Sequence, residues 1–121
     1  MRPEESEFFD KGADWLDFVN LSISEINRSF FDFSKRWSHN QEILWVILSF
    51  DPIILTHECV YFATTNNSYE HCRREVGVTG LQALFTNLIR RKGTWRAHRG
   101  SRVDRLPTCE QAEVLYPCLF R

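Results

Sequence analysis

Long apolar runs are missing from this chain of 121 residues. A membrane-spanning helix needs about 18 or more consecutive apolar residues, whereas the longest run here, residues 43–48, has only the length of a strand. The N-terminal stretch MRPEESEFFD is acidic and lacks the apolar centre of a signal peptide. We therefore expect no membrane contact and a cytoplasmic location.

Closely spaced cysteine pairs are missing as well. The chain has four cysteines and no CxxC pair, and without a secretion signal we expect free thiols in a reducing compartment. Zinc fingers and ribbons need ligands at short, regular spacings. The residues of zinc-binding type follow no such spacing, so we expect no metal site: His57, Cys59, His71 and Cys72.

Internal repeats and linkers are also lacking, which predicts a single domain over residues 1–121. The proportions of apolar residues (43%) and charged residues (26%) are those of a folded, soluble protein. The net charge of −1 hides an asymmetry: residues 1–17 hold six acidic and two basic residues, whereas residues 90–105 hold seven basic residues and one acidic residue. Such a basic block predicts a contact with phosphate or nucleic acid.

Four stretches have the patterns of β-strands. Residues 18–24, FVNLSIS, alternate between apolar and small polar side chains, which is typical of a half-buried strand. Residues 43–50 are apolar on both faces and predict a central strand that ends at Asp51-Pro52. Residues 59–65, followed by a turn at Asn66-Asn67, and residues 112–119 predict two more strands.

Two stretches have the patterns of helices. Residues 25–36 predict either a helix, which Ser24 can cap, or an irregular segment. Residues 80–91 predict an amphipathic helix capped by Thr79, because their apolar residues recur at helical spacing: Leu81, Leu84, Phe85, Leu88 and Ile89. Residues 92–110 hold two glycines, a proline and most of the basic block, so we expect a long functional loop there.

Gln111 and Glu113 stand at the entrance of the last predicted strand. Residues two apart on a strand point to the same face, so these two side chains are expected to share either a pocket or the solvent. A fixed carboxylate can stabilise the oxocarbenium-like state of glycosidic bond cleavage, including loss of nicotinamide from NAD+. Gln111 offers both a donor and an acceptor for an amide-like edge. An exposed strand end with no catalytic role is the alternative.

The basic loop has aromatic residues among its bases. Guanidinium groups bind phosphates, and an aromatic ring can stack on an unpaired base. The candidates for contact with single-stranded nucleic acid are therefore Trp95, Arg96, Arg99 and Arg102. The alternative is a solvated loop beside the C-terminus of a helix, where cations are favoured in any case.

Three stretches resemble the DarT-type DNA ADP-ribosyltransferases. QAEVL (111–115) resembles their catalytic strand, WVILSFDPIILTHECVYFATTNN (45–67) their central strand, D-P turn and following strand, and FVNLSIS (18–24) the preceding strand. The resemblance runs from about residue 17 to the end. It implies an α+β fold with the split antiparallel sheet of ADP-ribosyltransferases and flanking helices.

The resemblance also implies an activity. Such proteins are toxins that move ADP-ribose from NAD+, their substrate, to a base in single-stranded DNA, and their usual antagonist is a macrodomain antitoxin. It gives the catalytic role to Glu113, a place beside the base to Gln111, and substrate recognition to residues 93–110. An arginine that orients NAD+ would correspond to Arg28, with Arg36 behind it.

Two departures from the family pattern accompany the resemblance. The family begins with a strand whose histidine grips NAD+, and no such segment precedes Asp17; the family also continues past its glutamate strand. We therefore expect a reduced or partial domain. Two alternatives to an active transferase stay open: a nucleic-acid-binding module without catalysis, and an inactive remnant of the same fold.

Overall fold

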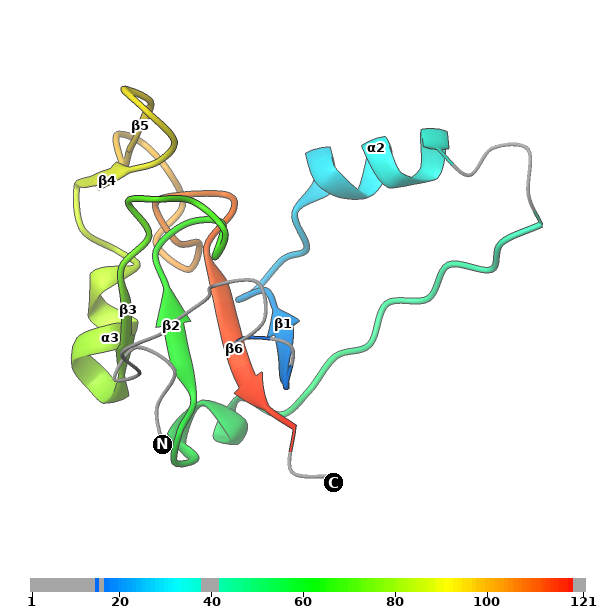
Figure 1. The fold of residues 1–121 in the computed structure, drawn as a ribbon, viewed down its shortest axis with the longest axis horizontal. Helices are drawn as coiled ribbons and strands as arrows, with labels where there is room; N and C mark the ends of the chain where they lie inside the picture. Colours follow the sequence, from blue (N-terminus) through cyan, green and yellow to red (C-terminus); the bar gives the residue numbers. More distant parts are fainter. Residues whose placement is uncertain (1–14, 16, 38–41, 119–121) are drawn as a thin grey trace.

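The computed structural model describes residue 15, residues 17–37 and residues 42–118. Within them the chain forms two antiparallel sheets and few helices, which confirms the predicted α+β class (Figure 1). The elements, in chain order, are β1 (Phe18–Leu21), α2 (Arg28–Trp37), the 3-10 helix η2 (Pro52–Thr56), β2 (Tyr61–Ala63), β3 (Arg74–Val76), α3 (Gly77–Ala83), β4 (Leu88–Arg90), β5 (Arg96–His98) and β6 (Glu113–Pro117). No helix in these residues is both long and apolar enough to cross a membrane.

The larger sheet has the strand order β1-β6-β2-β3, and all of its neighbouring strands are antiparallel. The last strand in the sequence therefore lies between the first two. Its register pairs Leu115 with Asn20 of β1 and with Tyr61 of β2. The predicted strands at 18–24, 59–65 and 112–119 are confirmed, each in a shorter form.

The core lies on both faces of this sheet, because the side chains of β2 and β6 alternate between two apolar clusters. One cluster contains Trp15, Tyr61, Ala63, Cys72 and Leu115. On the opposite face, α3 packs against β2 and β3 and closes the second cluster, which contains Val60, Phe62, Leu84, Ala112 and Val114. Burial of both faces explains why these strands are almost continuously apolar.

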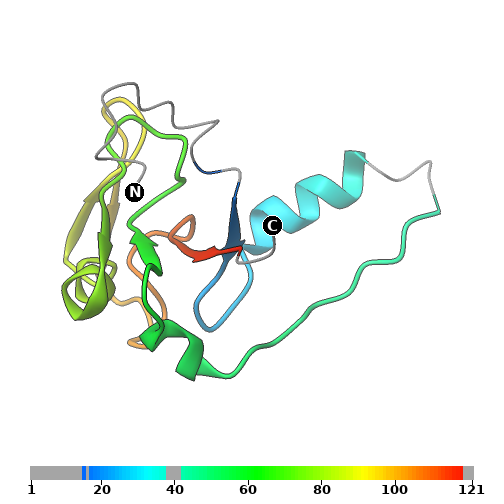
Figure 2. The same cartoon turned by 60° about the horizontal axis from the view of Figure 1, so that its bottom comes forward.

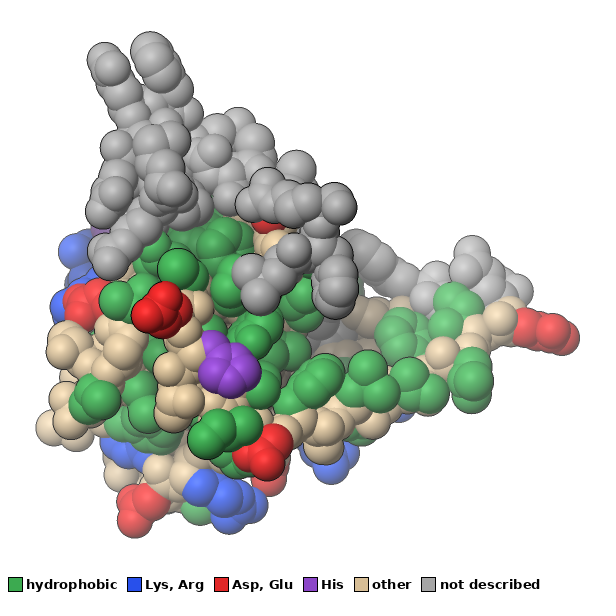
Figure 3. Space-filling view, turned by 90° about the horizontal axis from the view of Figure 1, so that it is seen from below, with side chains coloured by type: hydrophobic (Ala, Val, Ile, Leu, Met, Phe, Trp, Pro, Cys, Tyr) green, Lys and Arg blue, Asp and Glu red, His purple; other side chains and the backbone are tan. Residues whose placement is uncertain are grey.

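The prediction of a central strand at residues 43–50 is wrong. Residues 42–50 run extended away from the sheet and pair with no strand in the described part of the chain (Figure 2). Leu44 is 88% exposed and Leu48 is 72% exposed, and hydrophobic side chains line the arm that projects from the body (Figure 3). Apolar composition predicts burial, but a strand also needs hydrogen-bonding partners. Asp51 caps η2 instead, and accepts a bond from the N–H of Ile53.

The prediction of a helix at residues 80–91 is also wrong in its extent. The helix α3 ends at Ala83, and residues 88–90 form β4, which pairs with β5 in a separate hairpin. Leu84, Leu81 and Phe85 do pack in one apolar cluster. Their helical spacing in the sequence therefore reflects burial in the same cluster, although no continuous helix carries them. The N-cap of α3 is Val76, with no side-chain bond, rather than Thr79.

The helix predicted at residues 25–36 is confirmed as α2, but Ser24 does not cap it. Ser24 has a positive φ of 67°, and its hydroxyl donates to the carbonyl of Arg105. The carboxylate of Glu25 pairs with the guanidinium of Arg105 at 3.1 Å. These contacts tie the segment between β1 and α2 to the basic segment of the chain.

Candidate active site

Glu113 is the first residue of β6 and faces the turn that follows β2. Two donors hold its carboxylate: the backbone N–H of Asn67 lies 3.1 Å from Oε2, and Nδ2 of Asn20 lies 3.4 Å from Oε1. Burial of the side chain raises the pKa of Glu113 above its ordinary value of 4.5, and the bonds from Asn67 and Asn20 oppose this rise. The site thus presents a partly desolvated carboxylate with a fixed orientation.

Asn67 is itself held in place. Its side chain is buried, and Arg74 of β3 donates to both of its oxygens, from Nε to Oδ1 and from Nη2 to the backbone carbonyl, the latter at 2.7 Å. A side chain on β3 therefore reaches the residue that donates to Glu113. The sequence predicts a turn at Asn66-Asn67, but it contains no local pattern that would link Asn67 or Arg74 to Glu113.

Gln111 lies in the turn before β6, and both ends of its amide are bonded. Nη2 of Arg91 donates to Oε1 at 2.7 Å, and Nε2 donates to the hydroxyl of Tyr69 at 3.1 Å. Gln111 and Glu113 thus reach the same turn, at Tyr69 and Asn67 respectively. These bonds leave the amide one hydrogen and one lone pair for another partner.

The loop predicted at residues 92–110 contains β5 and is more ordered than expected. Trp95, at the turn of the β4–β5 hairpin, is 63% exposed, and the guanidinium of Arg91 lies 5.6 Å from its ring. Arg96 is exposed and donates to the nearby carbonyl of Thr94 at 2.6 Å. These two side chains are accessible to a ligand.

Arg99 and Arg102 bind the loop itself. Arg99 donates to Oγ1 of Thr108 at 3.1 Å and to the carbonyl of Val103 at 3.0 Å, and its guanidinium lies 5.3 Å from the ring of Phe85. Arg102 donates from Nε to the carbonyl of Pro107. Both arginines hold the fold of the loop, a role that the charge count could not reveal.

Two hollows lie beside these residues. Arg28, at the start of α2, and Arg102 line a hollow of about 130 Å³ that extends to Ala112, the neighbour of Glu113. A wider hollow of about 510 Å³ has a basic lining. Glu113 lines neither of these two hollows. The charged and imidazole-bearing residues around the wider one are Arg91, His98, Arg99, Arg102 and Glu110.

The residues of zinc-binding type do not form a cluster. No group of three or more His, Cys, Asp or Glu side chains suited to a metal ion is found in the described ranges. His57 instead contacts the hydroxyl of Tyr116 through Nδ1 at 2.5 Å, and the thiol of Cys72 donates to the carbonyl of Thr65.

The geometry around Glu113 can be compared with known proteins. A family model described as "ssDNA thymidine ADP-ribosyltransferase, DarT" matches residues 4–120. No curated protein and no solved structure matches the chain. The family match covers nearly the whole chain and includes the Glu113 strand, the turn at Asn67 and the basic loop. The chain belongs to the DarT family of single-stranded-DNA thymidine ADP-ribosyltransferases.

Proposed function

We propose that this chain transfers ADP-ribose from NAD+ to thymidine in single-stranded DNA. The observation that carries the proposal is the environment of Glu113: a partly buried carboxylate, at the start of a central strand, that two N–H donors hold in one orientation. The family to which the chain belongs supports the acceptor, because its description names single-stranded DNA and thymidine.

In the proposed reaction, the bond between ribose C1′ and the nicotinamide nitrogen breaks, and nicotinamide leaves as a neutral molecule. Positive charge develops on C1′ and the ring oxygen. The ionised carboxylate of Glu113 stabilises this charge and accepts a hydrogen bond from a ribose hydroxyl. The thymine ring nitrogen that carries a proton then bonds to C1′ and loses that proton to solvent. The products are ADP-ribosylated DNA, nicotinamide and a proton.

We assign supporting roles to three other parts of the chain. Arg28, which lines the smaller hollow, orients NAD+, as the resemblance to the family implies. Gln111 lies beside the acceptor base and uses the hydrogen and the lone pair that Arg91 and Tyr69 leave free. Trp95 and Arg96 contact the DNA strand from the β4–β5 hairpin, by stacking and by phosphate binding respectively.

The cellular role that fits this activity is that of a cytoplasmic toxin with a macrodomain antitoxin. Modification of a DNA base blocks its Watson–Crick edge, so a cell that makes the enzyme needs an antagonist. A macrodomain that removes ADP-ribose from DNA would meet that need. Co-expression with such a macrodomain should restore growth to cells that the chain alone arrests.

The experiment that tests the proposal compares wild type with Glu113→Gln, using NAD+ and an oligonucleotide that contains thymidine. Loss of the carboxylate removes a stabilisation of a few kcal/mol, so transfer should fall by about 100-fold or more. Glu58→Gln is the matched control, because Glu58 is exposed. An oligonucleotide without thymidine should accept nothing. Equal transfer by wild type and Glu113→Gln would overturn the proposal.

A nucleic-acid-binding module without catalysis is the second candidate, and the exposed Trp95 and Arg96 favour it. The two candidates differ in the fate of NAD+. A module of this kind would bind an oligonucleotide with a salt-dependent affinity and would leave NAD+ intact over long incubations. Release of nicotinamide by wild type, and not by Glu113→Gln, would exclude it.

A further inference from the structure

Arg74, Ala63 and Glu113 lie in one row across three strands. Ala63 of β2 is the cross-strand partner of Arg74 on β3 and of Glu113 on β6. Directly opposed residues in antiparallel strands point to the same face, so all three side chains share the face on which Trp15 and Tyr61 pack. Arg74 and Glu113 are thus two strands apart, about 10 Å, and Ala63 lies between them in the row.

Asn67 bridges this distance. Its two oxygens accept from one guanidinium, that of Arg74, while its backbone N–H donates to Glu113. The residue is thereby fixed by three hydrogen bonds that point in two directions. A planar guanidinium can bind two acceptors at once in a defined geometry, which a lysine ammonium does less well.

The turn that contains Asn67 is closed by its neighbour and not by Asn67 itself. Its neighbour Asn66 closes the turn by accepting from the backbone N–H groups of Ser68 and Tyr69. Within the residues that the structure describes, the two oxygens of Asn67 accept their hydrogen bonds from Arg74. A shift of Asn67 would remove the shorter of the two bonds that orient the carboxylate.

We propose that Arg74 is a positioning residue for Glu113 and that it acts through Asn67. Arg74 does not touch the reacting atoms; it fixes the N–H that sets the orientation of the carboxylate. This inference rests on the proposed function, in which that carboxylate faces the developing charge on the ribose. It adds a residue on a different strand to the parts of the chain on which turnover depends.

A purely structural role for Arg74 is the competing explanation. Its guanidinium also lies 5.7 Å from the ring of Trp15, and Nη1 lies 3.5 Å from the carbonyl of Cys72. Removal of the side chain will therefore lower stability whichever explanation holds. The test needs a readout that general stability does not change, and the titration of the Glu113 carboxyl group supplies it.

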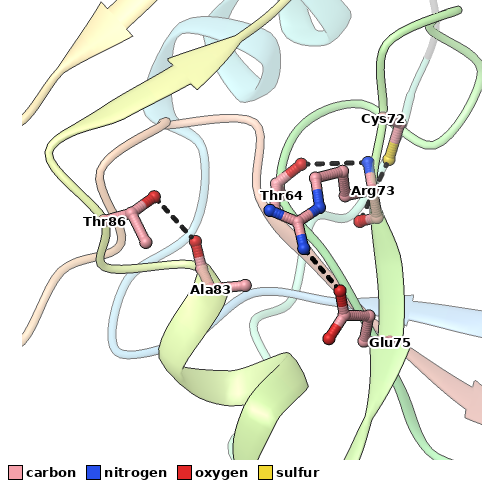
Figure 4. A network of polar contacts seen from close by, with 6 residues as sticks. All are labelled: Thr64, Cys72, Arg73, Glu75, Ala83 and Thr86. Carbon is pink, nitrogen blue, oxygen red and sulfur yellow. Dashed lines mark hydrogen bonds and ion pairs between the residues drawn. The ribbon is translucent and has the colours of Figure 1, made fainter.

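The chain offers a matched control in the neighbouring residue. Arg73 precedes β3, and its guanidinium pairs with Glu75 at 2.6 Å (Figure 4). Removal of the Arg73 guanidinium lowers the positive charge of the protein by one, as removal of the Arg74 guanidinium does. It removes no hydrogen bond to Asn67. Arg73→Met and Arg74→Met are therefore equal in charge and in side-chain shape.

The experiment measures two quantities in Arg74→Met, Arg74→Lys and Arg73→Met at a temperature where each is folded. The first is the pKa of the Glu113 carboxyl group by carbon NMR, which needs no catalysis. Arg74→Met should raise the pKa of Glu113 further, because a loosened N–H of Asn67 favours the charged carboxylate less. Arg74→Lys should raise this pKa by a smaller amount, and Arg73→Met should leave it unchanged. The second is transfer: kcat should fall about 10- to 100-fold in Arg74→Met, with KM for NAD+ within about twofold, because the cofactor contacts remain.

The outcomes separate this inference from the proposed function. An unchanged Glu113 pKa together with an unchanged kcat in Arg74→Met would overturn the inference, even with Glu113→Gln inactive. A raised pKa in a protein that never consumes NAD+ would support the positioning role and refute the function. Should Arg74→Met fail to fold, the Glu113 pKa and kcat are measured in Arg74→Lys and Asn67→Ala instead. If both quantities in these two variants equal those of Arg73→Met, the inference is overturned.

Discussion

The backbone N–H of Asn67 donates a hydrogen bond of 3.1 Å to Oε2 of Glu113, across 46 residues of sequence. The bond opposes the effect of burial, which raises the pKa of the carboxyl group. A contact between a turn and a strand therefore favours the ionised form that the proposed reaction needs.

The raised pKa of Glu113 predicts how stability depends on pH. Below the ordinary value of 4.5, the group is protonated in both the folded and the unfolded chain and costs nothing. As the pH rises above that value, the unfolded chain ionises this group first, while the folded chain keeps it protonated. The free energy of unfolding therefore falls until the pH has passed the folded-state pKa. The free energy of unfolding of Glu113→Gln, relative to wild type, should rise over that interval and then level off. Urea unfolding from pH 4 to 8 measures it, and parallel curves would contradict the prediction.

Substitutions in the basic loop are predicted to weaken DNA binding at exposed positions and to lower stability at positions that hold the loop together. Trp95→Ala and Arg96→Ala should weaken binding of a single-stranded oligonucleotide and leave the melting temperature unchanged, because both side chains are exposed. Each lost phosphate contact should lower the log–log salt slope by about 0.7, so Arg96→Ala should lower it and Trp95→Ala should not. Fluorescence anisotropy at several salt concentrations measures the slope.

Arg99→Ala serves as the contrasting variant. It should lower the melting temperature, because its guanidinium holds Thr108 and two carbonyls of the loop. An unaltered melting temperature in Arg99→Ala, or an unaltered salt slope in Arg96→Ala, would refute this division.

Gln111→Ala is predicted to separate the two half-reactions. NAD+ hydrolysis, which needs Glu113 and the cofactor, should survive in part. Transfer to DNA should fall further, by roughly 1–3 kcal/mol, because the base loses its hydrogen-bond partner. Tyr69→Phe is the control: it removes one bond that holds the amide and keeps the amide itself. Parallel loss of hydrolysis and transfer in Gln111→Ala would leave the residue with a structural role alone.

Gly80→Ala is predicted to destabilise the fold. Gly80 is buried in α3, and a Cβ there would lie 2.3 Å from the backbone oxygen of Glu75 and 3.1 Å from the ring of Phe62. Backbone cannot yield as a side-chain tip does, so the loss should be about 1–3 kcal/mol. Val78→Ala, at a position that is 70% exposed, should cost much less. Chemical denaturation of both variants would test the difference, and equal losses would contradict it.

The sequence predicted strands well where side-chain alternation and burial agreed. For β1, β2 and β6 the apolar residues serve a core on one or both faces, and their position in the chain was found correctly. Residues 43–50 carry the same composition, yet the described chain offers them no partner strand. Residues 80–91 have helical spacing because Leu81, Leu84 and Phe85 meet one cluster, although the chain leaves the helix after Ala83.

The candidate site was predictable only where its residues lie close together in the sequence. Gln111 and Glu113 are two residues apart, so their pairing could be proposed from strand geometry. The alternation of residues 18–24 predicts a polar strand face, and Asn20 on that face reaches Glu113. Asn67 and Arg74 come from other elements, and contacts between distant segments have no local pattern in a single sequence.

The position of β6 has a consequence for how the protein is made. β1 and β2 are not neighbours in the sheet; β6 joins them, and Val114 and Leu115 fill the core on its two faces. During synthesis, the segments that carry Asn20 and Asn67 leave the ribosome long before Glu113 does. Neither can orient a carboxylate until β6 inserts between the earlier strands. The geometry around Glu113 therefore forms together with the core, and a chain in which β6 has not yet inserted has neither.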